Sequence, residues 1–354
     1  MALLQPPRSS YTQASRKVWF SYVEGSNRFQ HELLGITNSY IAGNLYLQFP
    51  KGEPLNAKQI EVSITGTEYV HWTEKVTRTR QVYDSSTNSY YTQLYVETIH
   101  YLHEQQILNR SLILWQSRNL NNNVRSKKEL YENITNMYIP FQIPLPNDIP
   151  PSMSLGTGTI YYNMNAKIKR KSNFWKCQGS KKMIKCNCNI LRYSLMPMTD
   201  PIKWVEWDDQ KAWKRGLGYD VFMYYSTFGP ENPIIVKFAL KFYKNDLIIK
   251  EVFVGLKEYH VFRASENVKL ISGYVEERRV SGDQFPNISD AHNEWSYNFK
   301  IEVLDDKVNW SIDRYNISVY HKVKVKIRFG LFSGKKNINL ERKVNIENIY
   351  KNPE

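Results

Sequence analysis

Residues 317–329 alternate apolar and polar side chains along their whole length, and this run limits the possible folds more than any other part of the chain. One set of alternate positions is mainly Ile, Val and Phe, whereas the other carries the cations Lys322, Lys324, Lys326 and Arg328. Successive side chains of a β-strand point to opposite faces. The run therefore predicts a strand with one buried face and one wet, cationic face.

Shorter runs of the same alternation occur at residues 45–49, 60–64, 160–168 and 236–242, whereas helical periodicity is scarce. Stretches that contain Gly and Pro, such as residues 50–54, separate the runs, as is typical of turns between strands. The 25 Tyr and 9 Trp residues also favour strands. The sequence predicts an all-β fold whose sheets pack face to face as sandwiches.

The chain length of 354 residues favours two domains. A shift in composition marks the boundary, because residues 149–199 contain nine Lys or Arg and no acidic residue, and alternation resumes on both sides. We expect a first sandwich at residues 15–170, a basic inter-domain connection at residues 171–184 and a second sandwich at residues 185–350.

The formal net charge of +14 indicates an anionic partner. The candidate anion or cargo contacts are the cations of the 317–329 strand and of the region around the connection, namely Lys322, Lys324, Lys326, Arg328, Lys169, Arg170, Lys171, Lys181, Lys182 and Lys185. Alternatively, such side chains are solvated and protect an edge strand from aggregation. Nucleic acid is not an expected partner, because the basic strand lacks interleaved aromatic side chains and no recognition helix or zinc finger is evident.

Residues that could carry catalysis or bind a metal are few. His100 and His103, beside Glu104, would share a metal only on a helix and with a third ligand. The three cysteines, at positions 177, 186 and 188, lack the spacing of a zinc knuckle and are expected to be small buried side chains. We therefore expect no enzyme activity, no catalytic or metal site and no cofactor. The absence of a signal-like or membrane-spanning apolar run predicts a cytoplasmic chain.

Several segments together resemble one family. Residues 41–47 and 54–66 resemble the early strands of an arrestin-like N-terminal domain, and residues 138–146, 150–152 and 158–168 are similar to the alpha-arrestin signature. Residues 228–236 and 317–325 resemble strands of its C-terminal domain. On this resemblance the chain is identified as an alpha-arrestin, or arrestin domain-containing protein, of fungal type. The family-motif positions, all expected to be structural, are Gly43, Pro140, Phe141, Pro146, Pro150, Pro151, Ser152, Gly158, Gly229 and His321.

The resemblance implies two tandem immunoglobulin-like β-sandwich domains and an adaptor that binds cytosolic tails or loops of membrane transporters and receptors. Alpha-arrestins recruit HECT-type ubiquitin ligases through Pro-Pro-x-Tyr motifs, so that cargo enters ubiquitin-linked endocytosis. Here the segments 6–9 and 150–153 contain Pro-Pro but lack the Tyr. The ligase is therefore expected to bind through another adaptor.

Acidic phospholipid is a further expected partner, which would place the protein at the periphery of the plasma membrane or endosomes. Two other functions stay open on the sequence. One is a retromer-type arrestin-fold sorting subunit, and the less favoured one is a nucleic-acid-binding protein.

Overall fold

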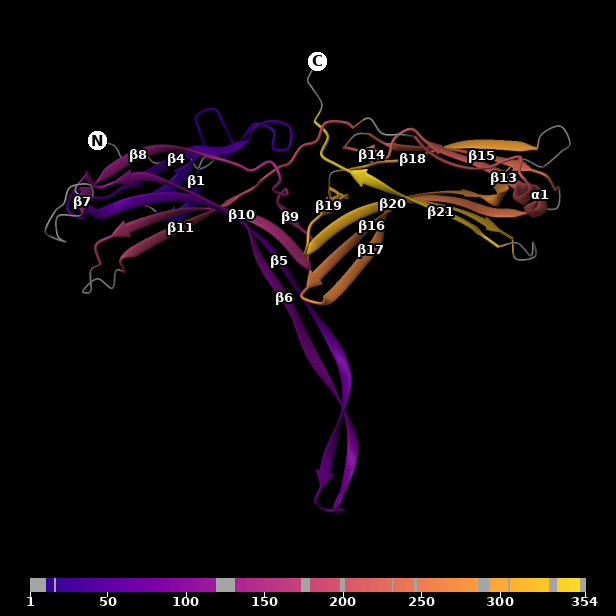
Figure 1. Cartoon of the computed structure of the whole chain (residues 1–354), viewed down its shortest axis with the longest axis horizontal. Helices are drawn as coiled ribbons and strands as arrows, with labels where there is room; N and C mark the ends of the chain where they lie inside the picture. The colour runs from indigo at the N-terminus through magenta and orange to yellow at the C-terminus, as the bar shows by residue number, and fades with distance from the viewer. Residues whose placement is uncertain are drawn as a thin grey trace. The chain divides into compact units, whose positions relative to one another are not determined.

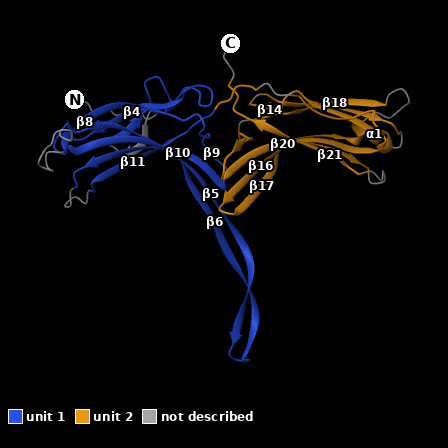
Figure 2. Cartoon of the chain, viewed as in Figure 1, with its two compact units in different colours: residues 1–192 blue, residues 193–354 orange. Residues whose placement is uncertain are grey.

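The computed structural model describes residues 11–15, 17–118, 131–172, 179–197, 201–230, 232–244, 247–285, 293–304, 306–330 and 336–350. Its elements are almost all antiparallel strands, so the prediction of an all-β fold is confirmed. The chain forms two compact units, residues 1–192 and 193–354 (Figure 2). The only described α-helix, α1, spans Gln210–Arg215, which is too short to cross a bilayer.

Unit 1 contains two sheets (Figure 1). The first sheet consists of β1 (Tyr11–Ser15), β2 (Val18–Ser21), β4 (Tyr40–Gln48), β3 (Gln30–His31) and β8 (Asn136–Pro144). The second consists of β11 (Lys181–Cys188), β10 (Gly158–Arg170), β5 (Leu55–Asp84), β6 (Ser89–Gln116), β7 (Glu132–Ile134) and β9 (Met153–Ser154). Alternate side chains are buried along β10 and along β5 as far as Trp72, as a period of two requires of a sandwich.

Strands β5 and β6 are far longer than the sequence predicted, since the alternation in β5 was evident only at residues 60–64. Strand β10 accompanies β5 from Ala57 to Val70. Beyond Val70, β5 and β6 continue together to a turn at residues 85–88, and Figure 1 shows them leaving the body of unit 1 as a twisted ribbon. Most side chains of this ribbon are exposed.

Two family-motif segments have clear packing roles in unit 1. The hydroxyl of the fully buried Tyr162 donates a hydrogen bond to the carbonyl oxygen of Pro150 at 2.6 Å. A Cβ atom on Gly66 would lie 2.5 Å from the Tyr162 ring, so only glycine allows this close approach. The amide of Ser152 donates to the carbonyl of Ile190, whose amide in turn donates to the Ser152 hydroxyl. These contacts tie the Pro-Pro-Ser segment into the sandwich.

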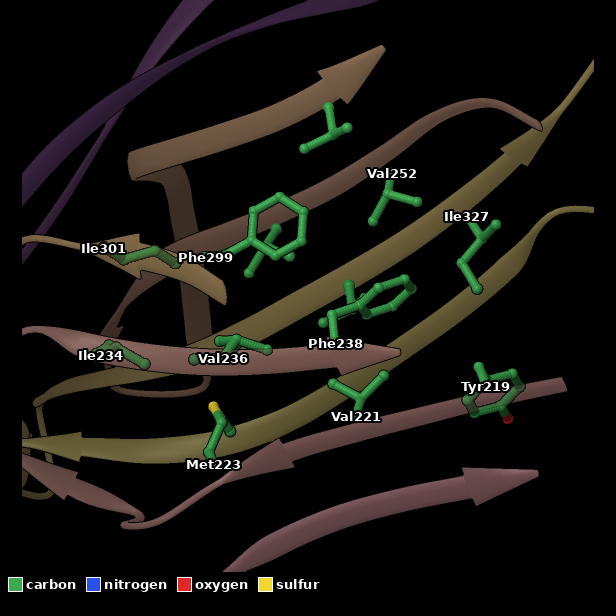
Figure 3. Packing of buried hydrophobic residues seen from close by; sticks show 14 of the residues in the cluster. Tyr219, Val221, Met223, Ile234, Val236, Phe238, Val252, Phe299, Ile301 and Ile327 are labelled. Atoms are coloured by element: carbon green, nitrogen blue, oxygen red, sulfur yellow. The ribbon is translucent and has the colours of Figure 1, made fainter. Parts of the chain in front are cut away.

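Unit 2 is also a two-sheet sandwich. One sheet contains β12 (Ile202–Glu206), β13 (Leu217–Met223), β15 (Ile234–Phe242) and β18 (Glu294–Ile301). The other contains β14 (Thr227–Phe228), β21 (Ile338–Ile346), β20 (Ile317–Phe329), β16 (Ile249–Ala264), β17 (Asn267–Ser281) and β19 (Ile312–Asp313), and a 3₁₀ turn, η2, spans Gly282–Gln284. Figure 3 shows side chains from both sheets, among them Phe238, Phe299 and Ile327, that meet in the core.

The division between the units lies later in the chain than the sequence suggested. Residues 181–188 form β11, which pairs with β10 from Tyr162 to Lys169. The segment at residues 171–184 is therefore not an inter-domain connection, because its described part belongs to a hairpin of unit 1, and the units divide after Arg192. The basic composition marked a surface hairpin rather than a domain boundary.

A carboxylate lies inside unit 2, hydrogen-bonded from several directions. Glu258 accepts hydrogen bonds from the amide of Asn309 at 2.8 Å and from its side chain at 2.9 Å, and its two oxygens lie 2.5 Å from His260 Nε2 and 2.9 Å from His321 Nε2. The second ring nitrogen of His321 lies 3.0 Å from the Ser311 hydroxyl. The family-motif His321 thus has a structural role, linking β20 to β16 and to the loop before β19.

Replacing Glu258 by Gln is expected to lower the free energy of unfolding of unit 2 by about 2–4 kcal/mol. The hydrogen-bond donors around Glu258 now share two carboxylate oxygens, whereas a Gln side chain would offer them one oxygen and place an NH₂ group against the rest. Equilibrium urea unfolding of the full chain measures the change, with hydrogen exchange in β16 and β20 assigning it to unit 2. Glu266→Gln, an exposed change in the β16–β17 turn, is the control and should shift stability by less than about 0.5 kcal/mol. Equal unfolding midpoints for the two variants would contradict this role of Glu258.

The same carboxylate is expected to make unit 2 sensitive to acid. Burial alone would raise the pKa of Glu258, but hydrogen bonds from His260, His321 and Asn309 outweigh burial and hold this pKa well below its ordinary value of 4.5. The stabilisation that ionised Glu258 gives to the folded state is therefore complete above the ordinary pKa of a glutamate. It is lost as the pH falls below that value. Between about pH 5 and pH 3 the free energy of unfolding should fall more steeply for the wild type than for Glu258→Gln. Parallel curves in that range would refute the assignment.

Candidate protein-interaction surfaces

An aromatic ladder crosses the outer face of the first sheet of unit 1. Trp19 on β2 lies opposite Tyr46 on β4, which lies opposite Tyr138 on β8. The Trp19 and Tyr46 rings stack with centroids 5.4 Å apart and planes 4° apart, and the Tyr46 and Tyr138 rings are 5.0 Å apart. Tyr138 remains 56% exposed. Because directly paired residues of neighbouring strands share a face, three distant segments build one aromatic surface.

This ladder forms the floor of a groove of about 1280 Å³, which we call the aromatic groove. Residues 22–26 form part of its lining, and Asn44, Gln48 and Gln142 add side-chain amides beside the rings. Among the described residues that line it, Glu24 is the only charged one. The groove thus combines apolar rings with neutral hydrogen-bonding groups, which suits an extended peptide better than an anion.

Three cations gather in unit 1 where β10 ends and β11 begins. The ammonium groups of Lys17 and Lys182 each lie 5.9 Å from the centroid of the Phe49 ring. Burial, together with the charges of Arg170 and Lys17, lowers the pKa of Lys182. Glu53 lies 3.5 Å from Lys17 and offsets part of the charge. Lys17, Arg170 and Lys182 form the basic cluster of unit 1, and an anion placed among them would reduce their mutual repulsion.

The other sequence-predicted cations of this region are more dispersed. Lys169 lies opposite Lys181 across the β10–β11 hairpin and donates a hydrogen bond to the Gln59 side chain at 2.7 Å. Lys171 and Lys185 are exposed, and Lys185 lies opposite Asn165, four residue pairs along the hairpin from Lys169 and Lys181. Sequence inspection missed Lys17, because only the fold brings it to β11.

The four cations of β20 lie on one face of the strand, as expected, but three of them are paired. Glu341 of β21 lies 2.5 Å from Lys322 and 2.9 Å from Lys324, and Arg328 lies 2.9 Å from Glu251. Hydrogen bonds from the two lysines lower the pKa of Glu341 to about 2. Lys326 lies 5.5 Å from the centroid of the Phe253 ring. Acidic residues of neighbouring strands thus neutralise part of this face.

The remaining sequence candidates do not come together as a reactive site. His100 and His103 lie on a strand, where an odd spacing directs them to opposite faces, and the described residues contain no group of three or more metal-ligating side chains. Cys186 and Cys188 are buried on the inner face of β11, and burial raises the pKa of Cys188 to about 12, with a smaller contribution from Cys186. Cys177 lies outside the described residues.

Residues 36–188 match the family model described as Arrestin (or S-antigen), N-terminal domain. The match lies within unit 1 and ends where β11 ends, at Cys188. No curated protein matches the chain. The matched region contains the Pro-Pro-Ser segment packed against Ile190 and Tyr162, and it supplies two of the three rings of the aromatic ladder. Residues 36–188 of unit 1 are therefore similar to an arrestin N-terminal domain.

Proposed function

We propose that this arrestin-like protein is a non-enzymatic adaptor that binds cytosolic tails or loops of membrane transporters and receptors in the aromatic groove. The observation that carries this proposal is the row of rings formed by Trp19, Tyr46 and Tyr138. Stacked aromatic side chains provide large, rigid contact area, and the amides beside them can pair with a peptide backbone. The groove exceeds the usual 300–1,000 Å³ of a small-molecule site, which favours an extended segment.

As an adaptor, the protein would act in ubiquitin-linked endocytosis and trafficking at the plasma membrane or endosomes. Its Pro-Pro segments lack the Tyr of a Pro-Pro-x-Tyr motif, so a HECT-type ubiquitin ligase would be recruited through another adaptor. The basic cluster would add contact with acidic phospholipid, and cargo and membrane would then be recognised together. Charge alone would bias the location, since each cation near an acidic leaflet contributes about 1 kcal/mol.

Replacing the exposed Tyr138 by Ala is expected to weaken binding of cytosolic-tail peptides by about tenfold, since it removes one ring from the groove. Binding of the purified chain to an array of peptides from transporter and receptor tails, followed by titration of the best ones, measures this loss. Tyr161→Ala is the matched control, because Tyr161 is a partly exposed tyrosine on the other sheet of unit 1. Unchanged titrations with Tyr138→Ala would exclude the aromatic groove as the cargo site.

The lipid contribution is tested by removing two cations of the basic cluster. Arg170→Gln with Lys182→Gln should lower partitioning onto vesicles that contain phosphatidylserine by about 30-fold, since two cations contribute roughly 2 kcal/mol. Lys211→Gln with Lys214→Gln removes the same charge from α1 and should have a much smaller effect. If both double variants float with vesicles to the same extent, net charge alone explains binding and the basic cluster has no special part in it.

A further inference from the structure

Residues 71–102, the part of the β5–β6 ribbon beyond the last β5 residue paired with β10, are here called the arm. Its two strands pair residue by residue, without a register shift, from His71 and Leu102 to Asp84 and Ser89. In the described part of the chain, β6 pairs with β5 alone. A two-stranded ribbon has two open edges, each with a row of backbone amides and carbonyls that have no partner strand.

The two edges of the arm differ in protection. Proteins usually blunt open edges with charged side chains, above all Lys, or with Pro or a bulge. The β5 edge carries Lys75, Arg78 and Arg80. The β6 edge has no Lys, Arg, Pro or Gly from Ser89 to Asn109, and its register is unbroken up to Gln106. With 48 Lys and Arg in 354 residues, an average stretch of this length would carry roughly three.

The side chains along the β6 edge are apolar and accessible. On one face of the arm, Tyr90, Leu94 and Val96 are 71%, 68% and 62% exposed. On the opposite face, Glu97 is neutralised within its own arm by Arg78 at 2.7 Å. The edge is thus long, nearly neutral and rich in aromatic and β-branched residues, which favour strand pairing.

We propose that the β6 edge of the arm pairs with the β6 edge of a second copy of this chain, antiparallel and about a two-fold axis. In an isologous antiparallel pair, like faces of the two ribbons join. With Thr98 at the axis, Leu94 lies opposite Leu102 of the second copy, and Tyr95 opposite its Tyr101. The two acidic residues of the edge, Glu97 and Glu104, then lie opposite Ile99 and Thr92 of the second copy.

This register favours a second copy because the edge is self-complementary. Leu94 meets Leu102, Tyr95 meets Tyr101, Thr98 meets Thr98, and no carboxylate directly opposes another carboxylate. The β6 edge also offers no cation to select an acidic partner strand, and in this register Glu104 meets Thr92 of the second copy rather than another charge. The pairing continues the sheet and joins two ribbons into four strands, a number at which sheets become stable.

The oligomeric state of the full chain tests the proposal. Sedimentation equilibrium over a range up to about 100 µM should show a reversible dimer. Thr98→Lys should weaken it by at least about tenfold, because two cations would then oppose each other at the axis. Thr77→Lys is the matched control, since Thr77 is an exposed threonine of the same arm, pairs with Val96 and lies on the β5 edge. It should leave the dimer unchanged.

A cysteine in place of Thr98 gives an independent readout. Under mild oxidation Thr98→Cys should form a covalent dimer, since opposed positions of antiparallel strands bring Cβ atoms within disulfide distance, whereas Thr77→Cys should not. Thermal unfolding of each variant checks that the arm change leaves the body folded. A wild-type chain that stays monomeric throughout would overturn the proposal and leave the edge to a strand of another protein. Equal loss of the dimer with Thr98→Lys and Thr77→Lys would overturn it as well.

Discussion

The ladder between β5 and β10 determines which part of unit 1 has a core. From Ala57 to Val70, β5 lies between two strands, and its alternate side chains enter a sandwich closed by the other sheet. The close approach of Gly66 to the Tyr162 ring fits β5 and β10 together, and the Tyr162 hydroxyl reaches the Pro150 carbonyl. Past Val70 the same strand loses β10, and after the buried Trp72 most of its side chains are exposed. The body and the arm of unit 1 therefore follow from where one strand pairing ends.

The surfaces of unit 1 differ in chemistry because they lie on different parts of that sandwich. The aromatic groove lies on the outer face of the first sheet, where cross-strand neighbours present rings and amides. The basic cluster lies at the ends of β10 and β11, where the repulsion of Arg170 and Lys17 acts on Lys182. An apolar peptide and an anion would thus occupy separate places, so recognition of cargo and of membrane would not compete for the same side chains.

The sequence predicts those elements whose burial is one-sided. The alternation at residues 317–329 coincides with β20, and that at residues 160–168 lies within β10. The arm was missed because both of its faces are exposed, so residues such as Thr77 and Leu94 are under no demand to alternate in polarity. The cations of β20 were located correctly, but Glu341 and Glu251 come from other strands and became visible only with the register. The aromatic ladder likewise needs two strand pairings, β2 with β4 and β4 with β8, that no local pattern shows.

Edge pairing of the arm would use backbone groups, and this leaves its side chains available. One face of the arm is organised internally, since Arg78 pairs with Glu97 and Trp72 stacks on Tyr101 with ring centroids 5.0 Å apart. The other face presents the exposed Leu94 and Val96 opposite Thr79 and Thr77. A strand added at the β6 edge makes the sheet wider. Both faces of the arm stay uncovered, because neighbouring strands lie side by side in a sheet. A dimer formed this way would double the exposed apolar face, and cargo binding in the aromatic groove would remain independent of it.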